Sequence, residues 1–82
     1  MCLGIPGQII EIVDAEKRLA LIEVLGTTHT TSMGLLAPDE VQVGAWVLMH
    51  AGMALRHIEE EQASQLLQLL KELDQAFEEE QG

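Results

Sequence analysis

The chain has few of the residues that small proteins use for cross-linking, aromatic packing or binding nucleic acid. Its 82 residues include one cysteine, one tryptophan, one phenylalanine, no tyrosine and four basic side chains. A single cysteine cannot form an internal disulfide, so the fold does not depend on oxidation, which suits a reducing cytosol. The chain has no apolar run of about 20 residues, which a membrane-spanning helix needs, and no secretory signal pattern. These absences predict a soluble cytoplasmic protein with no membrane partner.

Basic side chains are few, and their small number excludes one class of partner. The formal net charge is −10, and residues 57–82 carry eight acidic side chains against the single base Lys71. Small barrels that bind single-stranded nucleic acid need a cationic groove and stacking aromatic residues, so we exclude nucleic acid. The acidic segment can act as a solvated surface that keeps the protein soluble, or it can meet a basic partner.

The residues that the chain does contain predict a domain rich in β-strands. Nearly half of the chain is apolar, and short apolar or β-branched runs are separated by turn residues. These runs predict strands over 8–13, 19–25, 27–32, 45–51 and 53–58, with Gly52 as a bend or bulge between the last two. Pro6-Gly7 is expected to turn the chain into the first strand.

The last third of the chain has a helical period. Apolar side chains recur with the i, i+3, i+4 spacing of an amphipathic helix over about 59–79: Ala63, Leu66, Leu67, Leu70, Leu73 and Phe77. We expect this apolar stripe to pack on the strands. The predicted fold is therefore mainly β, a small OB-like Greek-key barrel (1–58) with an acidic C-terminal α-helix and tail (59–82), forming one domain.

Cys2 is the first candidate for chemistry. Removal of Met1 would make it the first residue, with a thiol and a free α-amine that together can chelate a soft metal, and the ammonium favours the thiolate. Gly4 and Pro6-Gly7 are expected to present this segment at the surface. The alternative is an inert thiol near a chain end.

His50 is the second candidate. Strand alternation places it on the face shared by Trp46 and Leu48, opposite Val47 and Met49. It is either a partly buried histidine bonded to a backbone carbonyl, or an imidazole beside the Cys2 segment that binds metal, accepts a proton or donates a hydrogen bond.

The remaining histidines are weaker candidates. His29 lies in a threonine-rich strand that we expect to be solvated, and His57 lies at the junction of strand and helix. One cysteine and three scattered histidines lack the paired spacing of a closed zinc site. The chain also lacks a P-loop, a dinucleotide fingerprint and a nucleophile elbow.

Two segments together resemble a known family. The run 1–9, MCLGIPGQI, and the run 44–54, GAWVLMHAGMA, closely resemble the HypC/HupF/HybG family of [NiFe]-hydrogenase maturation chaperones. The resemblance also covers chain length, strand order and the acidic C-terminal helix. Met53 departs from it, because many members are expected to have an aromatic residue there.

The resemblance implies a non-enzymatic carrier. The family works with the iron–sulfur scaffold protein HypD, where iron carrying cyanide and carbon monoxide, Fe(CN)2CO, is assembled, and then with the precursor of the hydrogenase large subunit. By resemblance, Cys2 and His50 are the residues for the iron. The contacts with partners fall on Cys2, Leu3, Gly4, Pro6, Gly7, His50 and Gly52.

Two other functions stay open on the residues alone. One is a metal-free interaction module that uses its acidic helix to bind a basic partner, and whose binding would weaken with salt. The other is a small metal-dependent enzyme subunit or a zinc protein.

Overall fold

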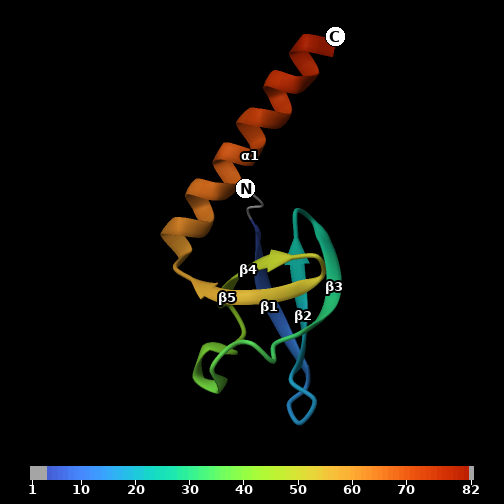
Figure 1. Cartoon of the computed structure of the whole chain (residues 1–82), viewed down its shortest axis with the longest axis vertical. Helices are drawn as coiled ribbons and strands as arrows, with labels where there is room; N and C mark the ends of the chain where they lie inside the picture. The colour runs from blue at the N-terminus through green and yellow to red at the C-terminus, as the bar shows by residue number, and fades with distance from the viewer. Residues whose placement is uncertain (1–3, 82) are drawn as a thin grey trace.

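The computed structural model describes residues 4–81 of the chain, and the side chains as far as residue 73. Five strands precede one long helix (Figure 1). In chain order the elements are β1 (Ile5–Asp14), β2 (Leu19–Val24), β3 (Thr27–Ser32), the 3-10 helix η1 (Pro38–Glu40), β4 (Trp46–His50), β5 (Met53–Ile58) and α1 (Glu60–Gln81).

The strands form one antiparallel sheet in the order β3-β2-β1-β4-β5. The fourth strand returns beside the first, which is the Greek-key arrangement. The edge strands β3 and β5 come within 8 Å of each other between Cα atoms, yet no ladder joins them in the described chain. The predicted mainly β class with a C-terminal helix is confirmed, and the sheet curls into a partly open barrel.

The core lies on one face of this sheet, which we call the inner face. Every strand except β3 contributes apolar side chains that are at most 7 % exposed, and Met33 and Leu36 from the following loop close over them. Burying one such side chain contributes about 1.5–3 kcal/mol. The buried strand residues of this cluster are Ile9, Ala20, Ile22, Val47, Met49 and Ala54.

Pro6 and Gly7 do not form the expected turn. Both lie inside β1 and pair with Leu48 and Val47 of β4. A Cβ at Gly7 would lie 2.6 Å from Cγ2 of Ile22 and 3.2 Å from Cγ of Met49. The glycine is therefore needed for close packing on the inner face, and the strand begins earlier than its β-branched residues indicate.

Two tight turns shape the ends of the sheet. Leu25-Gly26 joins β2 to β3 with φ of 49° and 85°, and Ala51-Gly52 joins β4 to β5 with φ of 52° and 77°. Two consecutive residues with positive φ are typical of the type I′ hairpin turn, whose twist matches that of the strands. Gly52 is thus a turn residue and not a bulge.

The first half of α1 packs against β1 and β4. The Glu59 N–H donates a hydrogen bond to Oε1 of Gln62 (3.1 Å) at the helix start. Ala63 is buried and Leu66, Leu67 and Leu70 are half-buried, whereas Leu73 is 59 % exposed. The expected packing of the leucine stripe therefore holds for its first half only. Phe77 lies outside the described side chains, and no described helix is long and apolar enough to cross a membrane.

Candidate functional site

His50 is the last residue of β4, and its side chain is exposed. The burial of β4 alternates, with Val47 and Met49 buried on the inner face and Trp46 and Leu48 half-buried on the opposite, outer face. The predicted placement of His50 on the face of Trp46 and Leu48 is confirmed. The alternative, a partly buried histidine, is not confirmed, because the His50 side chain is exposed.

The N-terminal end of β1 runs beside His50. The ladder pairs Pro6 with Leu48 and Ile5 with Met49, so the next step along this register brings Gly4 to His50. Gly4 is buried, and a Cβ there would lie 2.4 Å from Cγ of Leu48 and 2.8 Å from the backbone oxygen of Met49. Only glycine allows this approach. Cys2 and Leu3, the other predicted residues of this segment, lie outside the described residues.

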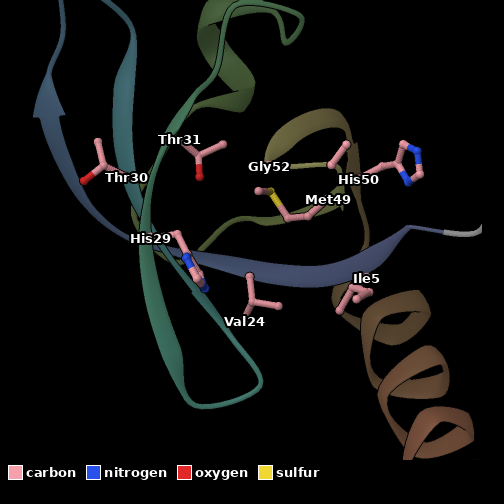
Figure 2. Close-up of a pocket in the computed structure, with 9 residues that line it drawn as sticks. Ile5, Val24, His29, Thr30, Thr31, Met49, His50 and Gly52 are labelled. Carbon is pink, nitrogen blue, oxygen red and sulfur yellow. The ribbon is translucent and has the colours of Figure 1, made fainter.

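A cleft of about 470 Å³ opens between β3 and the β4–β5 turn. Figure 2 shows Met49 extending from β4 towards β3, while the His50 ring extends away from it. The lining has an apolar floor and a polar rim, and consists of Ile5, Val24, His29, Thr30, Thr31, Met49, His50, Ala51 and Gly52.

Two histidines that are distant in the sequence contribute to the lining of the cleft. His29 comes from β3 and His50 from β4, and both are exposed. The expectation that His29 lies on a solvated strand is confirmed, but its place beside the β4–β5 turn could not be predicted, because local patterns do not give the order of the strands. His57 lies elsewhere, half-buried in β5 and paired with Val47.

Metal ligands are sparse in the described part of the chain. No group of three or more histidine, cysteine, aspartate or glutamate side chains there could hold a metal ion. An exposed imidazole can still serve as one ligand or as a hydrogen-bond donor. A centre at His50 would therefore need ligands from the N-terminal segment or from a partner.

The fold is thus a small open β-barrel whose N-terminal strand packs beside an exposed histidine. The chain belongs to the HupF/HypC family, whose pattern it matches over residues 1–70. The family resemblance carried by the two runs of sequence is thereby confirmed.

Relatives from several bacteria match nearly the whole chain. The hydrogenase maturation factor HypC of Rhodobacter capsulatus is 41% identical over 80 residues, which is 95% of this chain and 83% of that protein. HypC of Azotobacter chroococcum is 41% identical over 82 residues, covering 100% and 93%. The hydrogenase maturation factor HybG of Escherichia coli K12 is 34% identical over 77 residues, covering 90% and 93%.

Proposed function

We propose that this protein is a hydrogenase maturation chaperone that carries or helps to assemble the Fe(CN)2CO centre with HypD. It then delivers the centre to the precursor of the hydrogenase large subunit and catalyses no reaction itself. Membership of the HupF/HypC family and the names of its relatives support the maturation role. The observation that carries the site is the close approach of Gly4 to the end of β4, beside His50.

This approach limits how far Cys2 can be from His50. Only Leu3 separates Cys2 from Gly4, and the two steps of chain between their Cα atoms span at most about 7 Å. Covalent geometry thus allows the Cys2 thiolate to reach the exposed imidazole. In the proposal, Cys2 binds the iron or the cysteine site of the partner, and His50 is the second ligand or a hydrogen-bond donor to a cyanide nitrogen.

The ligand chemistry suits a cargo that must be released. Cyanide and carbon monoxide favour low-spin iron(II), and soft thiolate and imidazole groups both bind iron. One or two protein ligands hold such a centre without enclosing it, so the next protein can take it over.

The residues predicted to contact partners fall into an exposed and a buried group. Gly52 is exposed, and a Cβ there would meet nothing within 4 Å, so a partner can approach it directly. Gly4, Pro6 and Gly7 are buried. We assign these three the task of holding the N-terminal segment against β4.

The test is anaerobic co-purification with HypD, comparing wild type with Cys2→Ala. We expect iron and the infrared bands of bound carbon monoxide and cyanide with wild type, and at least a tenfold loss of both with Cys2→Ala. Glu16→Ala is the matched control, because Glu16 is exposed in the turn at the other end of β1. If Cys2→Ala retains the bands and supports an active hydrogenase, the proposed site is wrong.

One observation favours the metal-free interaction module as a second candidate. Leu69 and Leu73 of α1 are 48 % and 59 % exposed in a segment rich in carboxylates. In that case iron would be absent from every complex, and partner binding would weaken steeply between low and high salt.

A further inference from the structure

The edge strand β3 lacks the features that usually prevent an edge from pairing with another chain. Its six residues include no proline and no Asp, Glu, Lys or Arg. Its ladder with β2 runs through six consecutive pairs without a register shift. Natural edges are commonly protected by charge, proline or bulges. The other edge, β5, carries Arg56 and pairs with β4 through a register shift.

The turn geometry shows which backbone groups of β3 point outward. A two-residue turn makes Val24 and Thr27 a hydrogen-bonded pair, and bonded pairs then alternate along an antiparallel ladder. His29 and Thr31 therefore bond to β2, as does Met33 beyond the strand, whose N–H donates to the Arg18 oxygen at 2.7 Å. The N–H and C=O groups of Thr28 and Thr30 point away from β2.

The cleft provides the space beside this edge. A strand lying between two neighbours needs about 9.5 Å between them, so none fits where β3 and β5 come within 8 Å. Three consecutive residues of β3, His29 to Thr31, line the cleft. The side chains of Thr30 and Thr31 lie on opposite sides of the strand (Figure 2), so the cleft meets the edge of β3 and not one face only.

The chemistry of the cleft excludes a second copy of β3 as the occupant. Pairing places alternate side chains of the added strand in neighbouring pockets, and the floor here is formed by Ile5, Val24 and Met49. A second β3 could offer only threonine, serine or histidine. Two chains of net charge −10 would also repel each other.

A large-subunit precursor fits these requirements. Metal binding is coupled to folding, so a metalloprotein that lacks its centre has segments that are not yet packed. Such a segment can present free backbone groups and a large apolar side chain. The acidic surface of this chain favours a neutral or basic segment.

We propose that β3 accepts a short extended segment of the large-subunit precursor. The segment adds to the sheet edge at Thr28 and Thr30 and places one large apolar side chain in the cleft. This inference rests on the proposed function, because it assumes that the precursor is a partner. It puts the bound segment in the cleft that is also lined by Ile5, at the start of β1, and by His50.

Amide hydrogen exchange tests the pairing directly. The free protein and its purified complexes with the precursor and with HypD are compared by NMR. We expect the Thr28 and Thr30 amides to exchange at least tenfold more slowly in the precursor complex, because their N–H groups become hydrogen-bonded. The inward-facing His29 amide is the internal reference, since it is already bonded to β2.

A pair of variants isolates the outward N–H group. Thr30→Pro and Thr30→Val both remove the hydroxyl, and only proline removes the N–H, which an edge strand tolerates on its outer side. We expect the precursor to bind Thr30→Pro at least tenfold more weakly than Thr30→Val. Thermal unfolding of both variants checks that β3 is intact. If proline disturbs the strand, the hydrogen exchange of the wild-type protein still tests the pairing.

The outcomes separate this inference from the function on which it rests. A precursor complex that forms without protection of Thr28 and Thr30 overturns the edge pairing and leaves the chaperone function standing. Protection that appears only with HypD overturns the choice of occupant. If the precursor does not bind at all, both the inference and the delivery step of the proposed function are wrong.

Discussion

Two hairpins of the sheet, β2–β3 and β4–β5, share one turn geometry but differ in almost everything else. Leu25-Gly26 and Ala51-Gly52 have the same succession of positive φ values. The β2–β3 hairpin is regular and ends in an uncharged edge, whereas β4–β5 contains a register shift, carries Arg56 and has His50 at its turn. The same backbone turn thus supports an edge suited to another strand in one hairpin and an exposed imidazole in the other.

Strand β1 joins these two hairpins, and one glycine lies where they meet. A Cβ at Gly7 would touch Ile22 and Val24 of the first hairpin and Met49 of the second. The cleft between the hairpins is lined by two of the same residues, Val24 and Met49. Because Gly7 has no side chain, the two hairpins can pack close together on β1. The shape of the cleft depends on this spacing.

The largest expected effect is a difference in hydrogenase maturation between variants of the two histidines that line the cleft. His50→Ala should lower hydrogenase maturation at least tenfold, because it removes the imidazole beside the N-terminal segment. His29→Ala should lower it less, because His29 lies on the opposite rim. Hydrogenase activity in cells carrying each variant measures the difference. Both side chains are exposed, so the free energy of unfolding should change by no more than about 0.5 kcal/mol. Equal losses for the two variants would contradict this division of roles.

A smaller effect is expected at the junction of the hairpins. Gly7→Ala should lower the free energy of unfolding by about 1–3 kcal/mol, because the new methyl group overfills the core. Gly34→Ala is the matched control, since its Cβ would meet only Ser32 Oγ at 3.4 Å. Urea unfolding of both variants measures the contrast. Equal stabilities would show that β1 can move away from the hairpins without cost.

The smallest effect concerns the turns themselves. Leu25→Asn and Ala51→Asn should each raise the free energy of unfolding by about 0.5–1 kcal/mol, because asparagine adopts positive φ more readily than leucine or alanine. The two gains should be similar, since the two turns have similar angles. Gly26→Ala, at φ 85°, should have the opposite sign. A gain at one turn only would show that the hairpins differ in backbone strain as well as in side chains.

Local patterns predicted the elements well, and the contacts between them less well. The β-branched runs and the leucine period located all five strands and the helix within a few residues, because both signals are local. The roles of Gly4 and Gly7 were missed, because they depend on Leu48, Ile22 and Met49, which are distant in sequence. The placement of His29 and His50 along one cleft likewise required the order of the strands.

The candidate site depended on a different kind of information. The residue types at Cys2 and His50 suggested metal chemistry, but the specific cargo came from the family resemblance. The structure adds the register that brings the start of β1 to Met49, the neighbour of His50 in β4. It does not describe Cys2, so the assignment of iron ligands stays a prediction.

The early start of β1 also decides how the protein can be handled. Pairing with β4 begins at Ile5, so an affinity tag fused ahead of residue 1 would join the chain only four residues before the sheet begins. It would also remove any free amine from Cys2. The far end of α1 projects away from the strands (Figure 1), and a helix of 22 residues is about 33 Å long. A tag or a fluorescent label belongs at the C-terminus.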